Sequence, residues 1–214
     1  MTEIFDISRA LSHDLAPWPG DVGFQLKLNG RIAEGSSVNV GMISMSLHNG
    51  SHAHARYHFE DDGWTIEQAQ LATCIGPAVV VDLSHKYEGN AMPQVTIADL
   101  ARHSAELRAA PRLLLKTDVW RDPSIFPNEI PVVAPEVPAS LGERGVKLRF
   151  DVPSVDEISS KNLRNHHAIA AAGINIVESL DLSCVSAGRY QLVALPLKIA
   201  GGDGSPVRAI LWRD

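Results

Sequence analysis

Four of the nine histidines in this 214-residue chain stand within eleven positions, in the stretch HNGSHAHARYH. They are His48, His52, His54 and His58. In one straight strand, the first two would lie about 13 Å apart at ~3.3 Å per residue, too far to share a metal ion. In one helix, the third would rotate away from the face that carries the first two. The chain must therefore bend, and an Asn-Gly pair at 49–50 is a strong turn signal there.

Clustered imidazoles of this kind indicate a metal site. Imidazole suits zinc, manganese or iron, and three such ligands leave a coordination position open for catalysis. The chain has only two cysteines, Cys74 and Cys184, so a cysteine-based site is excluded and any further ligands must be histidines or carboxylates. The alternative interpretation is a solvated histidine-rich loop that binds metal only adventitiously.

Residues 163–180 contain a second pair of candidate ligands. The pattern predicts a helix over 163–172 that ends at Gly173, followed by a strand over 174–180. The turn would fold the strand back against the helix, so that His166 and Glu178 converge, with His167 as a competitor for His166. A carboxylate among apolar residues is costly without a partner, which a metal ion or a salt bridge would supply.

The remaining pattern predicts the elements that position these residues. Short β-branched strands interleaved with a few helices are typical of an α/β (mixed α+β) domain with a mixed sheet. Strands are expected over 38–47, 77–84, 111–119, 146–152, 174–180, 190–199 and 206–212. Helices are expected over 97–107, opened by a capping box of Thr96 and Asp99, and after Pro135 at the first helical position, ending at Gly145. Strand 38–47 would deliver His48, and the chain would return with His52 and His54.

Composition narrows the function. The net charge of −6 without a run of like charges argues against nucleic acid or an anionic membrane surface as a partner. No stretch approaches about 18 uninterrupted apolar residues, and the N-terminus lacks the pattern of a signal peptide. Two cysteines are too few for a disulfide framework, so we expect a cytoplasmic protein. No repeat or low-complexity segment divides the chain, which predicts one domain over residues 1–214.

The histidine stretch resembles the H-x-G-[ST]-H-x-D-x-P-x-H-F signature of the cyclase family of metal-dependent hydrolases. The resemblance continues through PWPGD at 17–21, GSSVNV at 35–40, DVPSVD at 151–156, the spacing of His166 and Glu178, and residues 194–211. It looks most like the kynurenine formamidase branch. It implies a compact cyclase-like single domain with a mixed, partly barrel-like sheet and flanking helices. It also implies a homodimer or higher homo-oligomer that acts on a small molecule with zinc or manganese.

The resemblance also implies residue roles. His48, His52 and position 54 would bind metal, and His166 and Glu178 would complete the site or hold a second ion. His58 would be the acid–base residue, and Trp18 would line the substrate pocket.

This chain departs from the signature at two positions. His54 replaces an aspartate that can bridge two metal ions, which favours one ion per chain, with zinc ahead of manganese. Arg56 replaces a proline. It would bind a substrate carboxylate, pair with a neighbouring acid at 60–62, or remain a solvated surface residue.

The activity implied is amide hydrolysis, in which a metal activates water and His58 passes the proton to the leaving nitrogen. The substrate implied is N-formyl-L-kynurenine, an intermediate of tryptophan catabolism, which would give L-kynurenine and formate. One alternative is a relative that opens a cyclic amide or lactone, of the isatin hydrolase or dienelactone hydrolase type. Another is a small-molecule binding protein whose catalysis is impaired by His54. A serine hydrolase is disfavoured, because no G-x-S-x-G motif is present.

Overall fold

The computed structural model describes residues 1–89 and 91–213. Its strands are β1 (Glu3–Asp6), β2 (Gln25–Gly30), β3 (Val40–Ser44), β4 (His52–His54), β5 (Ile75–Asp82), β6 (Arg112–Lys116), β7 (Lys147–Phe150), β8 (Val177–Glu178), β9 (Gly188–Pro196) and β10 (Gly204–Arg213). Its α-helices are α1 (Ile97–Ala101), α2 (Ser104–Ala109), α3 (Val137–Glu143) and α4 (Arg164–Ala171). Within this part of the chain, no helix is both long and apolar enough to cross a membrane.

Seven strands form a closed, mixed barrel. The order β10-β4-β8-β7-β6-β5-β9 returns to its start because β9 also pairs with β10, and β1 adds to β10 outside the ring. The pairs β5–β6, β6–β7 and β7–β8 are parallel, and the other pairs in the ring are antiparallel. The expected mixed, partly barrel-like sheet of a cyclase-like domain is confirmed.

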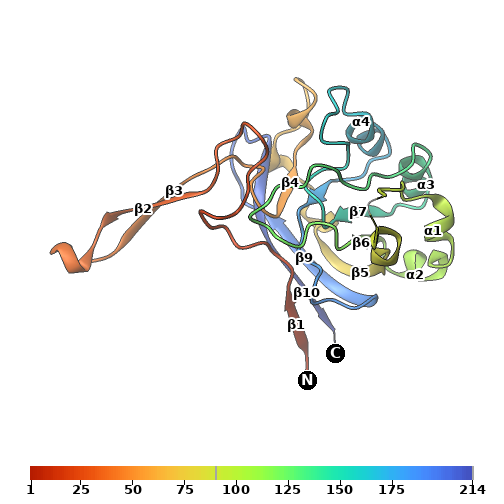
Figure 1. The fold of residues 1–214 in the computed structure, drawn as a ribbon, viewed down its shortest axis with the longest axis horizontal. Helices are drawn as coiled ribbons and strands as arrows, with labels where there is room; N and C mark the ends of the chain where they lie inside the picture. The colour runs from red at the N-terminus through yellow and green to blue at the C-terminus, as the bar shows by residue number, and fades with distance from the viewer. Residues whose placement is uncertain (90, 214) are drawn as a thin grey trace.

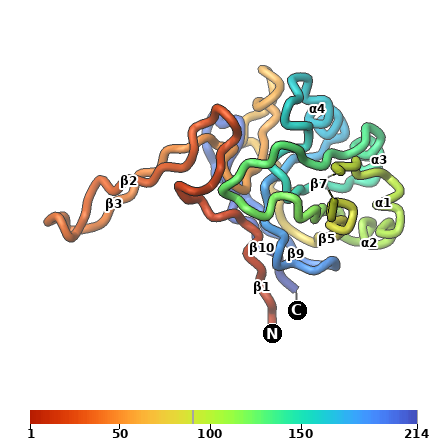
Figure 2. Tube along the Cα trace, viewed as in Figure 1, coloured from red at the N-terminus to blue at the C-terminus, as the bar shows by residue number. Residues whose placement is uncertain are grey.

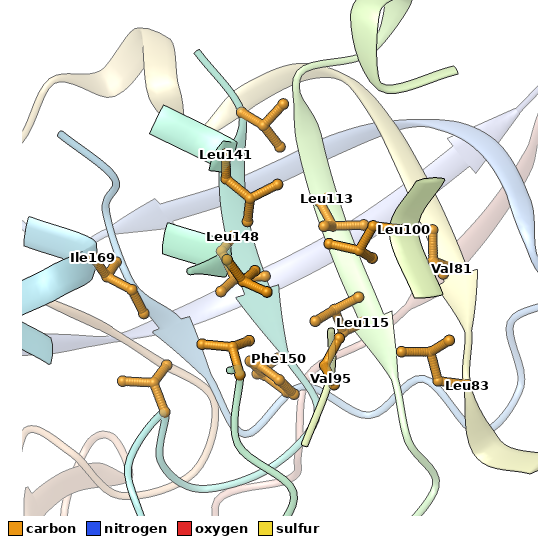
Figure 3. Close-up of a cluster of buried hydrophobic side chains, with 14 of the residues drawn as sticks. Val81, Leu83, Val95, Leu100, Leu113, Leu115, Leu141, Leu148, Phe150 and Ile169 are labelled. Carbon is orange, nitrogen blue, oxygen red and sulfur yellow. The ribbon is translucent and has the colours of Figure 1, made fainter. Parts of the chain in front are cut away.

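Strand alternation divides the apolar residues between two cores. On β5, Val80 points into the barrel interior, whereas Val79 and Val81 point outward to the helices; β6 follows the same rule with Leu114 inside and Leu113 outside. Figure 3 shows the outer core, where side chains of β5, β6 and β7 meet Leu100, Leu141 and Ile169 of the helices. Helices thus cover one side of the barrel (Figure 1).

A two-stranded arm of β2 and β3 projects away from the barrel (Figures 1 and 2). Leu26, Ile43, Val40 and Met42 on this arm are about half exposed. The two chain ends lie near one another on another side of the molecule, where β1 pairs with β10 (Figure 1).

Several predicted boundaries are corrected. The strand expected over 38–47 ends at Ser44, so it belongs to the arm and does not carry His48. The capping box of Thr96 and Asp99 is present, but the helix it opens breaks after Ala101 and resumes at Ser104. Pro135 is not the first helical residue, because α3 begins at Val137 with Pro138 in its first turn.

Candidate active site

Strands β4 and β8 bring three candidate ligands together. The strands pair with His52 opposite Glu178 and Ala53 opposite Val177. Ala53 and Val177 pack inside the barrel, so His52, His54 and Glu178 point to its outer face. His54 Nε2 lies 2.9 Å from His52 Nε2 and 3.0 Å from Oε2 of Glu178. All three side chains are buried.

His48 and His58 meet at a carboxylate from the far end of the chain. Asp203, in the connection between β9 and β10, accepts hydrogen bonds through Oδ2 from His48 Nε2 at 2.8 Å and from His58 Nδ1 at 3.2 Å. The two imidazole rings lie 3.9 Å apart between centroids. Close approach requires Gly204, because a Cβ atom there would lie 2.7 Å from Cε1 of His48. Asp203 therefore fixes the orientation of both rings.

Helix α4 supplies His166. Its Nδ1 donates a hydrogen bond to Asp156 Oδ2 at 2.6 Å, and its Nε2 lies 4.0 Å from Oε1 of Glu178. His166 is buried, whereas His167 is exposed and lies 3.8 Å from Glu60. The helix thus points His166, and not its neighbour, toward Glu178.

The donor set fits a metal ion. A carbonyl or carboxylate accepts from one nitrogen of His48, His52 and His166, so that nitrogen carries a proton and the other is the nitrogen available to a metal ion. Buried His48 Nδ1, His54 Nδ1 and His166 Nε2 have no hydrogen-bond partner. In the described part of the chain, two groups have ligand atoms within 4.8 Å of one another: His48, His54 and His58, and His52, His54 and Glu178. Imidazole and carboxylate donors of this kind bind zinc or manganese.

Burial and crowding favour the neutral forms of His52, His54 and His58. Desolvation lowers the pKa values of His52 and His54 well below the usual value, and repulsion from His48 adds to it. The same two causes lower the pKa of His58 to about 4, although the hydrogen bond to Asp203 opposes them. Burial raises the pKa of Glu178 well above its usual value. Neutral imidazoles are the form that binds a metal, and a cation would stabilise the charged form of Glu178.

A cavity of about 300 Å³ opens onto these residues. Its aromatic wall contains Trp18, Trp120 and Phe126, with Phe126 in edge contact with both tryptophans at 5.3 and 5.8 Å between centroids. Trp18 therefore lies where a pocket residue was expected. Ser179, in the same cavity, has a φ of 59°, a strained conformation of the kind that clusters at functional sites.

The structure separates Arg56 from the other predicted site residues. His48, His52, His54, His58, His166 and Glu178 all line the 300 Å³ cavity, and Arg56 does not. Arg56 pairs with Glu60, Nε to Oε2 at 2.6 Å, and lines a different cavity. Of the three expectations for Arg56, the structure therefore shows the salt bridge with an acid at 60–62.

Two carboxylates of the site were not singled out from the sequence. Asp203 and Asp156 lie in GGDGSPVR and DVPSVD, two segments of the family resemblance, but nothing in their spacing relates them to histidines far away in the sequence. Hydrogen bonds from His48 and His58 hold the pKa of Asp203 below its usual range. Burial raises the pKa of Asp156, but hydrogen bonds from His166 and Asn165 outweigh it and lower the value. Both carboxylates are therefore ionised acceptors at neutral pH.

Comparison with known proteins identifies the family of this chain. The model of the Cyclase family matches residues 5–157. Kynurenine formamidase of Geobacillus thermodenitrificans (strain NG80-2) is 40% identical over 212 residues, covering 99% of this chain and 98% of the relative. That of Bacillus cytotoxicus is 37% identical over 211 residues, covering 98% and 97%. The chain therefore belongs to the cyclase family.

Solved structures show the same fold at lower identity. A potential metal-dependent hydrolase with cyclase activity superposes with a TM-score of 0.81 at 24% identity, covering all of both chains. Isatin hydrolase A from Labrenzia aggregata gives a TM-score of 0.83 at 23% identity, covering 99% of this chain and 93% of the other.

Proposed function

We propose that this protein is a metal-dependent amide hydrolase that converts N-formyl-L-kynurenine and water to L-kynurenine and formate. The observation that carries the proposal is the convergence of five imidazoles and Glu178 on one cavity, in a chain similar over its full length to kynurenine formamidases. The aromatic wall of Trp18, Trp120 and Phe126 supports an aryl substrate, because aromatic pairs contribute about 0.5–1.5 kcal/mol beyond area burial.

The resident ion is zinc, with manganese as the second choice, and one ion per chain. His48, His52 and His54 would hold it, with His166 and Glu178 completing the shell. When bound, such an ion supplies Lewis acidity for the carbonyl and for an attacking water. One ion is favoured because the imidazole of His54 stands where a bridging carboxylate would serve two.

His58 carries the proton. Its Nδ1–H is held by Asp203, so Nε2 is left to accept a proton and pass it to the leaving nitrogen. A pKa of about 4 keeps the ring neutral and able to accept at pH 7. His58→Ala should therefore retain metal and lower turnover by roughly 10²–10⁴-fold. Unchanged turnover would remove His58 from this role.

The arm supports assembly into a homodimer. Its apolar side chains are exposed on both faces of the ribbon, and an isolated two-stranded ribbon is only marginally stable in water. A second copy of the chain is the partner we propose. The double variant Leu26→Lys, Ile43→Lys should then have the molar mass of a monomer, 23.2 kDa, when measured by light scattering.

We further propose a cytoplasmic location, where Cys74 and Cys184 remain free thiols.

Elemental analysis and a substrate panel test the function together. Untagged protein purified without added metal should contain about one zinc or manganese per chain and hydrolyse N-formyl-L-kynurenine faster than isatin or a dienelactone. Preference for a cyclic substrate would assign the cavity to ring opening. Absence of metal, of metal uptake and of turnover would indicate a binding protein impaired by His54.

A further inference from the structure

A second cavity, of about 210 Å³, shares His54 with the histidine cavity and no other lining residue. The rings of Phe59 and Trp64 line it, and so do the side chains of Gln68 and Gln70. Arg56 lines it as well. Both positions that depart from the family signature, 54 and 56, therefore meet at this cavity.

Arg56 retains unused hydrogen-bonding capacity. Its Nε lies 2.6 Å from Glu60 Oε2 in an ion pair that lacks hydrogen-bond geometry, and neither Nη atom has a hydrogen-bond acceptor among residues 1–89 and 91–213. The side chain is 37% exposed, so these donors remain accessible. A guanidinium with two free Nη donors is suited to bidentate binding of a carboxylate.

A group of cations contacts the backbone of two lining residues. Lys147 Nζ donates to the carbonyl of Gly173 at 2.6 Å, and Arg149 Nη1 donates to the carbonyl of Asn175 at 2.7 Å; both carbonyls belong to lining residues. Arg112 joins this group, because its Nε and Arg149 Nη2 donate to the same carbonyl at position 73.

These three cations have no carboxylate partner in the part of the chain that the structure describes, and Arg149 is fully buried. Burial and repulsion from Arg112 lower the pKa of Arg149 to about 10. An uncompensated buried cation is costly, and its field favours a negative charge nearby. No aspartate or glutamate is among the described residues that line the cavity, and Glu60, which pairs with Arg56, is not one of them.

We propose that this second cavity binds an aromatic monocarboxylate, with its carboxylate on Arg56 and its ring against Phe59 and Trp64. The aromatic side chains favour a planar apolar body, and the free Nη atoms and uncompensated cations favour an anion. The volume is below that of most drug-sized pockets, which restricts the ligand to about one ring. The proposal goes beyond the hydrolase function and does not depend on it.

A ligand here would contact His54 from outside the histidine cavity. Because His54 Nδ1 has no hydrogen-bond partner, no outer contact fixes this ring as Asp203 fixes His48. Occupancy of the second cavity would therefore affect the candidate metal site through one residue.

Titration of the full-length protein with benzoate tests the proposal. Calorimetry would give the affinity, and the indole N–H signal of Trp64 in NMR spectra, assigned through Trp64→Phe, would report the place of binding. Benzamide, a neutral molecule of the same shape, should bind at least about tenfold more weakly, because it lacks the charge that Arg56 recognises. Arg56→Gln should weaken benzoate by a similar factor and leave benzamide unchanged.

Two matched variants separate this cavity from the other. Glu60→Gln removes the carboxylate that competes for Arg56, so benzoate should bind several-fold more tightly. Trp18→Ala, in the histidine cavity, should leave the affinity unchanged. Equal affinity for benzoate and benzamide, insensitivity to Arg56→Gln, or loss of binding in Trp18→Ala would each overturn the proposal. None of these readouts requires turnover, so an inactive hydrolase would not affect the result.

Discussion

Replacing Asp203 by Asn tests whether one carboxylate orients both His48 and His58. The carboxylate accepts two hydrogen bonds through Oδ2, whereas an amide has one acceptor oxygen and a donor NH2 group. The amide oxygen has two lone pairs and can still accept from both imidazoles, but neither bond is then charge-assisted. A bond to a charged group is worth about 1.5–3 kcal/mol and a neutral one about 0.5–1.5 kcal/mol, so the two bonds together should weaken by about 1–3 kcal/mol. At about 1.4 kcal/mol per factor of ten, kcat or metal affinity should fall roughly 10- to 100-fold.

The sign of the accompanying pKa change follows from the same contacts. Asp203 raises the pKa of His58, against burial and His48, which lower it to about 4. In Asp203→Asn, the NMR titration midpoint of His58 should move to still lower pH. Asp6→Asn, which removes an exposed carboxylate of β1, is the charge-matched control and should change neither quantity. If kcat, metal content and the His58 midpoint all match those of the unaltered protein, Asp203 does not orient the site.

Three further predictions concern the site and the fold. His54→Asp should retain or raise the metal content measured by elemental analysis, because a carboxylate can bridge two ions. Gly204→Ala should weaken metal binding, since its Cβ would displace the ring of His48, whereas Gly89→Ala, with no atom within 4 Å, should not. Hydrogen bonds from Lys86 and the capping box outweigh burial and lower the pKa of Asp99. The stability that ionised Asp99 gives to the folded protein is therefore present above the unfolded-state pKa of about 4, and it is lost as the pH falls through the folded-state pKa of Asp99. The unfolding free energy of Asp99→Asn should be lower by about 1 kcal/mol at pH 7 in urea denaturation, with the difference vanishing in acid.

Local signals predicted the parts of the fold that depend on neighbours in sequence. The β-branched runs became β5, β6, β7, β9 and β10, and Gly173 ends the helix that carries His166, with a φ of 68°. The boundary of α3 was wrong because both Pro135 and Pro138 satisfy the same preference for the first turn, and propensity alone does not choose between them. The extended conformation within 38–47 was predicted correctly. The strand lies in a projecting arm because it pairs only with β2 and not with the barrel, and a local pattern does not show which strands a strand will pair with.

The candidate site was only partly predictable for a related reason. The turn at 49–50 and the alternation of His52 and His54 are local, so spacing alone indicated that these residues could converge. Asp203 is 155 positions from His48 and reaches it only because β10 pairs with β4 and closes the barrel. Spacing carries no information about such a contact, and neither does composition.

The outer contacts of the imidazoles explain where the site tolerates change. His48, His52 and His166 each have one nitrogen fixed by an acceptor, from Asp203, the Gly50 carbonyl and Asp156 respectively. Such contacts set the tautomer and aim the free lone pair. Altering His52 or His166 would also take a donor from a buried acceptor, and altering His48 would remove one of the two donors to Asp203. His54 alone among the four has no outer acceptor, and its Nδ1 is unpartnered. Of these four histidines, the one at a position where this chain departs from the family signature, His54, is therefore the one whose replacement disrupts the fewest contacts behind the site.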